Sequence, residues 1–133
     1  MTTVVDASTV VAALIDTGPD GQWAETLLTS DLAAPHLLTV EVASVLRRAA
    51  AAGDITDDVA SLAYGDLLDL RVQLVAFDLV AARVWELRHN LSSYDAWYVA
   101  VAELLGAPLA TLDQRLVSAP GPRCAFDMPP SSA

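Results

Sequence analysis

The chain has 133 residues, of which 17 are Asp or Glu, seven are Arg and none is Lys, which gives a formal net charge of -10. This length and a hydrophobic fraction of 54% predict one globular domain with its own core and exclude a disordered chain. We expect no membrane span and no export signal, because no apolar run approaches the roughly 18 residues of a membrane helix and the first residues carry no basic charge. The one cysteine, Cys124, excludes an internal disulfide and fits a reducing, cytoplasmic location.

The charge narrows the classes of function. A surface this acidic repels nucleic acid on average, which excludes a module that binds DNA or RNA through a broad basic face. The absence of Lys excludes a Walker phosphate loop, Schiff-base chemistry and a receiver-type phosphoacceptor site. Contact with a polyanion would therefore need metal ions or a few local arginines.

Short β-rich runs alternate along the chain with longer amphipathic segments, which is typical of an α/β sheet with helical crossovers. Polar caps and glycines mark the ends of the helices. The strands are predicted at residues 2–5, 34–38, 74–77, 108–111 and 123–126. The helices are predicted from a Ser8 cap to 15, over 22–28 after an Asp20 cap, from a Thr39 cap to 52 before Gly53, from Thr56 onward, over 79–91, over 94–105 after Ser93, and over 113–118.

The pattern contains no internal repeat and no linker long enough to divide the chain. The last five residues are rich in Pro and Ser, a composition that favours a frayed end. We therefore predict one domain over residues 1–128 and a disordered tail over 129–133.

Most catalytic chemistries lack their residues in this sequence. With only Cys124, His36 in a predicted strand and His89 late in a predicted helix, a thiolate or multi-histidine metal site is not available, and we expect structural or surface roles for these three residues. No serine has the glycine context of a nucleophile elbow, which disfavours a Ser-His-Asp triad. The carboxylates remain as the candidate catalytic groups.

Four acidic residues occupy positions that an α/β fold brings to one edge of its sheet. Asp6 follows the first predicted strand and Asp113 the fourth, while Glu41 and Asp95 lie in first turns of helices. Because the carboxyl ends of parallel strands share one edge, all four can point to the same rim. For Glu41 and Asp95, a simple capping or dipole role stays open. Converging carboxylates repel one another, and hard cations such as Mg²⁺ or Mn²⁺ are their natural counter-ions.

Four groups of residues carry a resemblance to a known family. They are Val4-Val5-Asp6-Ala7-Ser8; Pro35-His36-Leu37-Leu38 with Glu41-Val42 and Val45-Leu46-Arg47; Tyr94-Asp95-Ala96 with Tyr98-Val99-Ala100; and Pro108-Leu109-Ala110-Thr111-Leu112-Asp113 with Arg115-Leu116. In this order they resemble PIN-domain proteins, and more narrowly the VapC-type ribonuclease toxins of type II toxin–antitoxin pairs. The resemblance implies a PIN-like three-layer α/β/α fold with a central parallel sheet of four to five strands.

The resemblance also implies a site and a reaction. Asp6, Glu41, Asp95 and Asp113 match the acidic quartet of the family, as catalytic residues and as ligands of one or two Mg²⁺ or Mn²⁺ ions. The expected activity is that of a metal-dependent endoribonuclease, in which a metal-bound water hydrolyses an RNA phosphodiester bond.

Three further residues are expected beside this quartet. Ser8 and Thr111 match hydroxyl residues of the family that would hold the ligands or the substrate phosphate, with simple capping as the alternative. Arg115 is a candidate phosphate contact, or else part of a surface ion pair.

The resemblance implies a VapB-type antitoxin partner, a homodimer and a higher assembly with the antitoxin, and an acidic toxin suits a basic inhibitor segment. Because an acidic surface binds RNA weakly, we expect a selective cutter of a structured RNA such as tRNA or rRNA. Two alternatives stay open: a PIN-fold nuclease of RNA maturation, and a non-catalytic binding module of the same fold. The apolar residues that could form contact surfaces, or else pack in the core, are Trp23, Leu27, Leu28, Leu62, Tyr64, Leu67 and Leu68.

Overall fold

A five-stranded parallel sheet lies at the centre of the structure, a computed structural model that describes residues 1–130. The strand order is β3-β2-β1-β4-β5, so that β1 is the middle strand. The strands are β1 (Thr2–Val5), β2 (Asp31–Pro35), β3 (Val72–Val75), β4 (Leu109–Ala110) and β5 (Phe126–Asp127). The predicted α/β fold with a parallel sheet is confirmed.

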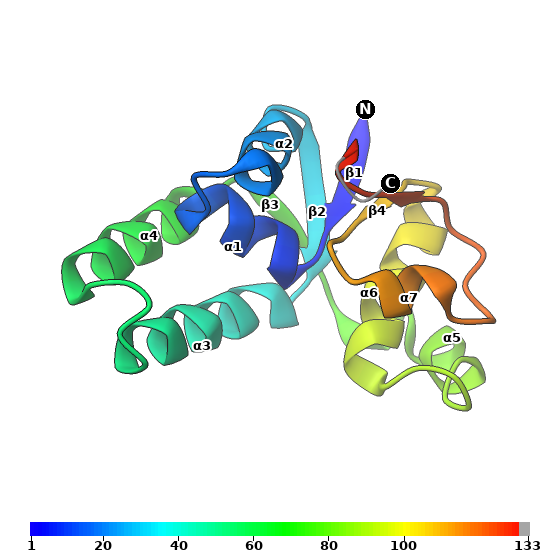
Figure 1. The fold of residues 1–133 in the computed structure, drawn as a ribbon. Helices are drawn as coiled ribbons and strands as arrows, with labels where there is room; N and C mark the ends of the chain where they lie inside the picture. Colours follow the sequence, from blue (N-terminus) through cyan, green and yellow to red (C-terminus); the bar gives the residue numbers. More distant parts are fainter. Residues whose placement is uncertain (131–133) are drawn as a thin grey trace.

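Helices flank this sheet on both faces, with α1 to α4 on one side and α5 to α7 on the other (Figure 1). Their bounds are α1 (Ala7–Ile15), α2 (Pro19–Leu27), α3 (Leu37–Ala51), α4 (Asp57–Asp69), α5 (Ala81–Glu86), α6 (Ser93–Leu105) and α7 (Gln114–Ser118), with a 3-10 turn η1 (Phe77–Leu79) before α5. The arrangement is the three-layer α/β/α architecture that the resemblance implied.

The core forms where β1 and its neighbours meet α6. Val4 and Val5 of β1 and Leu109 of β4 are completely buried, and Val4 lies opposite Leu109 in the parallel register. Helix α6 buries five successive residues, 98–102, because it crosses both β1 and β2. Burial of an aliphatic side chain stabilises the fold by about 1.5–3 kcal/mol. The packing of α6 on β1 and β2 therefore fixes the whole helix, including its N-terminus, against the sheet.

Two predicted strands lie earlier in the chain than expected. The second was predicted at 34–38 but ends at Pro35, and Leu37 and Leu38 begin α3 instead. His36, expected in a strand, is therefore an exposed residue at the N-terminus of α3. The third was predicted at 74–77, but β3 covers Val72–Val75, and Phe77 begins η1 instead. A short apolar run at the start of a helix has the same sequence pattern as a strand, because a helix and a strand each bury one face.

Several predicted helix starts are also corrected. Asp6, not Ser8, caps α1, and its side chain accepts a hydrogen bond from the Thr9 amide. Helix α2 begins at Pro19 after Gly18 rather than after an Asp20 cap, because proline fits the first turn of a helix. Helix α3 begins two residues before Thr39 and has no side-chain cap.

The ends of α4, α5 and α6 agree only in part with the predicted ones. The predicted helix over 79–91 is reduced to α5, preceded by η1. Thr56 caps α4 as predicted, and Ser92, one residue before the predicted Ser93, caps α6. Gly106 ends α6 with φ 61°, a left-handed conformation that favours glycine.

The end of the chain is described only as far as residue 130. Pro129, placed in the predicted tail, is buried, and residues 131–133 lie outside the described residues. The division into a domain over 1–128 and a tail over 129–133 stays a prediction. None of the helices within residues 1–130 combines the length and the apolar character that crossing a membrane requires.

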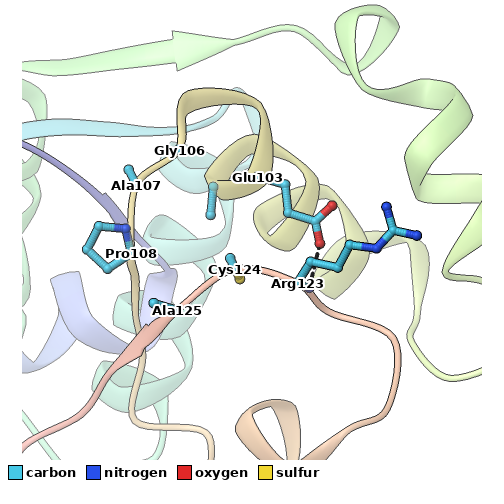
Figure 2. A pocket seen from close by; sticks show the side chains of 8 residues that line it. Glu103, Gly106, Ala107, Pro108, Arg123, Cys124 and Ala125 are labelled. Atoms are coloured by element: carbon cyan, nitrogen blue, oxygen red, sulfur yellow. Dashed lines mark hydrogen bonds between the residues drawn. The ribbon is translucent and has the colours of Figure 1, made fainter.

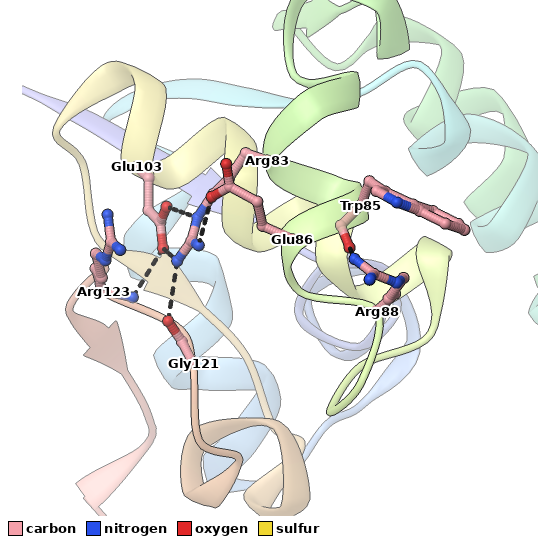
Figure 3. A network of polar contacts seen from close by, with 7 residues as sticks. All are labelled: Arg83, Trp85, Glu86, Arg88, Glu103, Gly121 and Arg123. Atoms are coloured by element: carbon pink, nitrogen blue, oxygen red, sulfur yellow. Dashed lines mark hydrogen bonds and ion pairs between the residues drawn. The ribbon is translucent and has the colours of Figure 1, made fainter.

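A polar network joins α5, α6 and the loop before β5 (Figure 3). Arg83 Nε donates to Glu103 Oε1 at 2.7 Å, and Arg83 Nη2 donates to the Gly121 carbonyl at 2.9 Å. The Arg123 amide also donates to Glu103, at 2.8 Å. Burial alone would raise the pKa of Glu103, but these hydrogen bonds and the charge of Arg83 lower it instead. The network therefore holds the β4–β5 connection against the two helices while Glu103 is ionised.

Candidate functional site

Four acidic side chains lie together at the carboxyl edge of the sheet. Asp6 follows β1, Asp113 lies three residues after β4, and Glu41 and Asp95 lie near the N-termini of α3 and α6. The charge of Asp6 acts on both Glu41 and Asp95, and that of Asp113 acts on Asp95. The structure thus brings together all four acids that the sequence placed on one rim; their role as ligands stays a prediction.

Asp6 is the most enclosed of the four, with 8% of its surface exposed. Its Oδ1 accepts hydrogen bonds from the Ser8 hydroxyl at 2.7 Å and the Thr9 amide at 3.0 Å. Its Oδ2 accepts one from the Thr111 hydroxyl at 2.5 Å. Burial raises the pKa of Asp6, although these hydrogen bonds act in the opposite direction. A buried acid needs such partners, because burying an unpaired charge is unfavourable.

The hydroxyls of Ser8 and Thr111 connect Asp6 to the loop after β4. Ser8 Oγ donates to Asp6 and accepts from the Leu112 amide at 3.1 Å. Thr111 Oγ1 donates to Asp6 and accepts from the Asp113 amide at 3.0 Å. Each hydroxyl therefore acts as donor and acceptor at once. The amide that donates to it leaves the hydroxyl's own proton directed at the Asp6 carboxylate. The two bridges hold the end of β1 and the end of β4 in one register at the rim.

Glu41 is held by a residue that sequence reasoning did not assign to the site. The Tyr98 hydroxyl donates to Glu41 Oε1 at 2.6 Å, across 57 residues of sequence. Burial raises the pKa of Glu41 most, the charges of Asp95 and Asp6 add to this, and the bond from Tyr98 partly reverses it. The sequence signal for Tyr98 was its position three residues after Asp95, which places both on one face of α6.

Asp95 and Asp113 complete the rim at two helix N-termini. Ser92 Oγ accepts from the Asp95 amide at 3.1 Å, and burial followed by the charge of Asp113 raises the pKa of Asp95. Asp113 caps α7, since its Oδ1 accepts from the Arg115 amide at 3.0 Å. Its carboxylate also lies 3.7 Å from Arg115 Nε, a side chain that is 95% exposed. These contacts are compatible with both interpretations of Asp113 and Arg115. The two residues can serve only as a helix cap and a surface ion pair, or they can also belong to the site.

The chemistry of the rim fits a hard divalent cation. Its donors are carboxylate oxygens, the ligands that Mg²⁺ and Mn²⁺ prefer. Burial raises the pKa of Asp6, Glu41 and Asp95, and repulsion from neighbouring acids adds to this for Glu41 and Asp95; a bound cation would relieve both effects. Within residues 1–130, no three His, Cys, Asp or Glu side chains are already arranged as a metal site.

The remaining candidate residues lie outside this rim. His36 and His89 are exposed, in keeping with surface roles. A separate pocket lies where α6 ends and β4 begins, at the opposite end of β4 from the acids (Figure 2). Cys124 in its wall is half-buried and packs against the core, and burial raises the pKa of its thiol to about 11. The thiol stays protonated at neutral pH, so this pocket offers no thiolate nucleophile. The residues that line the pocket are Ala102, Glu103, Gly106, Ala107, Pro108, Arg123, Cys124 and Ala125.

Comparison with known proteins gives consistent matches over most of the chain. A family model described as PIN domain matches residues 3–122. Ribonuclease VapC1 of Mycobacterium tuberculosis is 40% identical over 129 residues, which cover 91% of this chain and 92% of that protein. The crystal structure of PAE2754 from Pyrobaculum aerophilum is 26% identical with a TM-score of 0.67, and the match covers 89% of this chain and 84% of that one.

One more distant structure shares the fold. It is VapBC-5 from Mycobacterium tuberculosis, a member of the VapBC family of toxin–antitoxin systems. The TM-score is 0.55 at 21% identity, and the match covers 96% of each chain. At this identity the likeness concerns the fold.

Proposed function

The chain belongs to the PIN-domain family, and we propose that it is an endoribonuclease that acts as the toxin of a toxin–antitoxin pair. The proposal is supported by a relative named as a ribonuclease that matches nine-tenths of the chain at 40% identity. The observation that carries it is the rim itself: four carboxylates from four elements meet at one sheet edge, and one of them, Asp6, is buried. Burying a carboxylate is unfavourable, and ligand binding explains why such a group is kept.

The proposed reaction is hydrolysis of an RNA phosphodiester bond with Mg²⁺ or Mn²⁺ held by Asp6, Glu41, Asp95 and Asp113. When bound, such a cation supplies a nucleophilic water at neutral pH and stabilises charge on the reacting phosphate. Asp6 and Asp95 are the first choices as ligands, and Glu41 binds the cation or one of its waters. Asp113 caps α7 through Oδ1, and its Oδ2 would bind the cation.

The neighbouring side chains keep this arrangement in place. Ser8 and Thr111 donate to opposite oxygens of Asp6 and so restrict how its carboxylate can rotate. Arg115 projects into solvent beside Asp113, where its guanidinium can contact a phosphate of the substrate. Its charge also lowers the pKa of Asp95, against the larger effects of burial and Asp113. In this proposal Arg115 contributes one phosphate contact beside the acidic rim, and its surface ion pair with Asp113 is the alternative role.

The proposed substrate is a structured RNA, such as tRNA or rRNA. With a net charge of -10, this chain lacks the basic surface that binds long RNA regardless of sequence. Affinity must then come from a few contacts at the rim, and these select a particular shape or loop. Mapping RNA ends after induction of the toxin tests this, and indiscriminate digestion of total RNA would contradict it.

The proposed partners are a VapB-type antitoxin and a second copy of the chain, in the cytoplasm. The fold shared with VapBC-5 supports the antitoxin, and the acidic rim suits a basic inhibitor segment. On α4, Leu62 and Leu68 are 72% and 59% exposed and Tyr64 is 46% exposed, whereas Leu67 is buried in the core. These three exposed side chains are candidates for contact with a partner. Co-purification with the neighbouring small protein and light scattering test the two assemblies.

The decisive test of the activity is an Asp95→Asn variant. The amide keeps the shape of the side chain but removes its charge, so we expect RNA cleavage in Mg²⁺ to fall to background and Mn²⁺ binding, measured by calorimetry, to weaken. Asp58→Asn is the matched control, because Asp58 is an exposed first-turn acid of α4, away from the rim. Cleavage by Asp95→Asn at the parent rate would overturn the assignment, and absence of Mn²⁺ binding by the parent would favour a non-catalytic module.

A further inference from the structure

One polar group at the rim has no role in the reaction as described so far, namely the hydroxyl of Tyr98. The Tyr98 side chain lies on α6 one helical turn after Asp95, and the residue is only 2% exposed. Its oxygen lies 2.6 Å from Glu41 Oε1, a short distance for a hydrogen bond to a carboxylate. A buried phenol with its single proton directed at a candidate metal ligand is a specific arrangement rather than a solvent contact.

The direction of this hydrogen bond is unambiguous. The phenol carries the one proton of the pair, and an ionised carboxylate offers acceptor oxygens only. Tyr98 therefore donates, and Glu41 accepts through Oε1. The second carboxylate oxygen, Oε2, receives no hydrogen bond from the described residues, so it remains available to another ligand.

Glu41 depends on this one contact more than Asp6 and Asp113 depend on any one of theirs. Asp6 is held by three donors, and Asp113 by the backbone amide and the guanidinium of Arg115. Among residues 1–130, Tyr98 is the donor that holds the Glu41 carboxylate. A glutamate side chain has three rotatable bonds and loses considerable entropy when it is ordered. Without Tyr98, that entropy would be lost at the moment of cation binding.

We propose that Tyr98 is a positioning residue that fixes the Glu41 carboxylate through Oε1 and leaves Oε2 free to bind the divalent cation or its water, an inference that rests on the proposed metal-dependent function. The phenol packs between α6 and the sheet, so the orientation of Glu41 on α3 is tied to the helix that carries Asp95. Two acids from separate helices are thereby set in a fixed relation before a cation arrives.

The first experiment uses the metal-free protein and the variant Tyr98→Phe. Phenylalanine keeps the ring in the core, and the half-buried Glu41 carboxylate can accept from water, so we expect the variant to fold. Carbon-13 relaxation of the Glu41 carboxyl group, measured by NMR, should show a more mobile side chain in Tyr98→Phe than in the parent. Tyr64→Phe is the control, because Tyr64 is an exposed tyrosine of α4. Equal order of Glu41 in Tyr98→Phe and the parent overturns the proposal, whether or not the protein binds metal.

The second experiment measures Mn²⁺ affinity by calorimetry in the parent, Tyr98→Phe, Glu41→Gln and the double variant. Loss of a residue that orients a ligand weakens metal binding by about tenfold, so Tyr98→Phe should show a decrease of that order. In the Glu41→Gln background the same change should have almost no effect. An equal decrease in both backgrounds would mean that Tyr98 acts on the fold and not through Glu41, which overturns the proposal.

The two experiments separate this inference from the function on which it rests. A parent protein that binds no Mn²⁺ contradicts the metal-dependent function, and the metal-free NMR measurement still decides whether Tyr98 orders Glu41. A parent that binds Mn²⁺ with an affinity unchanged in Tyr98→Phe leaves the function intact and overturns the positioning role.

Discussion

The link between Thr111 and Asp6 gives a sharp test of how the rim is held. Thr111 is completely buried, and its hydroxyl donates to Asp6 Oδ2 and accepts from the Asp113 amide. Thr111→Val keeps the shape of the side chain and removes both contacts. Asp6 Oδ2 is then left in the interior without its donor, and the Asp113 amide loses its acceptor.

The expected loss of stability follows from these two contacts. A hydrogen bond to a charged group contributes about 1.5–3 kcal/mol and a neutral one about 1 kcal/mol, so the free energy of unfolding should fall by about 2.5–4 kcal/mol while Asp6 is ionised. With an unfolding entropy of about 2.1 cal/mol/K per residue, each kcal/mol lowers the melting temperature of a 133-residue domain by about 3.5 °C. Thr111→Val should therefore melt about 9–14 °C below the parent.

Thr9→Val is the matched control. Thr9 is equally buried, but its hydroxyl donates to a neutral acceptor, the Ala110 carbonyl, at 2.9 Å. Its loss should lower the melting temperature by about 3–4 °C at any pH in the working range. The bond from Thr111 favours the charged form of Asp6, so its contribution is present above the folded-state pKa of Asp6 and is lost as the pH falls through that value.

The assay is thermal unfolding followed by circular dichroism in the presence of a chelator, at about pH 8 and about pH 5. We expect the gap between the two variants to be wide at the higher pH and to narrow at the lower one. If Thr111→Val melts no lower than Thr9→Val, with a gap that does not change with pH, the assignment of a buried, charged hydrogen bond at Asp6 is wrong.

Three further outcomes are expected. Burial raises the pKa of three rim acids, and neighbouring charges add to this for Glu41 and Asp95, so the chelated parent should melt higher as the pH falls from about 8 to about 5.5, and Asp6→Asn should reduce that rise; a falling melting temperature contradicts this. Arg83→Met removes the bonds to Glu103 and Gly121 and should lower the free energy of unfolding by about 1–2 kcal/mol in the same assay, with RNA cleavage at 25 °C unchanged. Arg115→Ala, at a side chain that is 95% exposed, should raise KM for RNA several-fold with little change in kcat or melting temperature, and an unchanged KM would remove its phosphate role.

The position of the acids was predictable because it depends on short stretches of sequence. Asp6 follows Val4 and Val5, whose apolar character is enough to mark a buried strand, and the acid that ends such a strand falls at the carboxyl edge. Asp95 lies in the first turn of a helix with an evident polar start and a glycine end. Parallel order in the sheet then brings such positions together, whatever the details of packing.

The predicted helix cap and strand bounds that were wrong depend on which of several neighbouring residues takes a given structural role. Asp6 and Ser8 can each cap a helix, and the structure uses Asp6 as the cap while Ser8 donates to it. A strand was predicted at 34–38, but Pro35 is the last residue of β2, and the apolar Leu37 and Leu38 belong to α3. Local pattern does not distinguish these alternatives, because each satisfies the same hydrogen bonds or buries the same side chains.

The contact between Tyr98 and Glu41 lies beyond sequence pattern for a different reason. It joins α3 and α6 across 57 residues, and it depends on the packing of both helices against the same sheet, where α3 contacts β2 and α6 contacts β1 and β2. A tyrosine in a buried helix is ordinarily read as core, and its ring is indeed core. Only the position of its hydroxyl shows that it also belongs to the rim.

The net charge and the buried acid can be understood together. Hydroxyl and amide dipoles hold Asp6, yet its pKa remains raised, so the metal-free rim carries an unfavourable interaction that these dipoles do not remove. A bound cation relieves it, and binding therefore stabilises the fold, by about 2.7 kcal/mol at a free concentration of one hundred times Kd. A basic antitoxin side chain at the rim would relieve the same interaction. In the proposed function, inhibitor and cation would thus compete for the same carboxylates, and this competition would allow a strongly acidic chain to act on RNA and still be blocked by a basic partner.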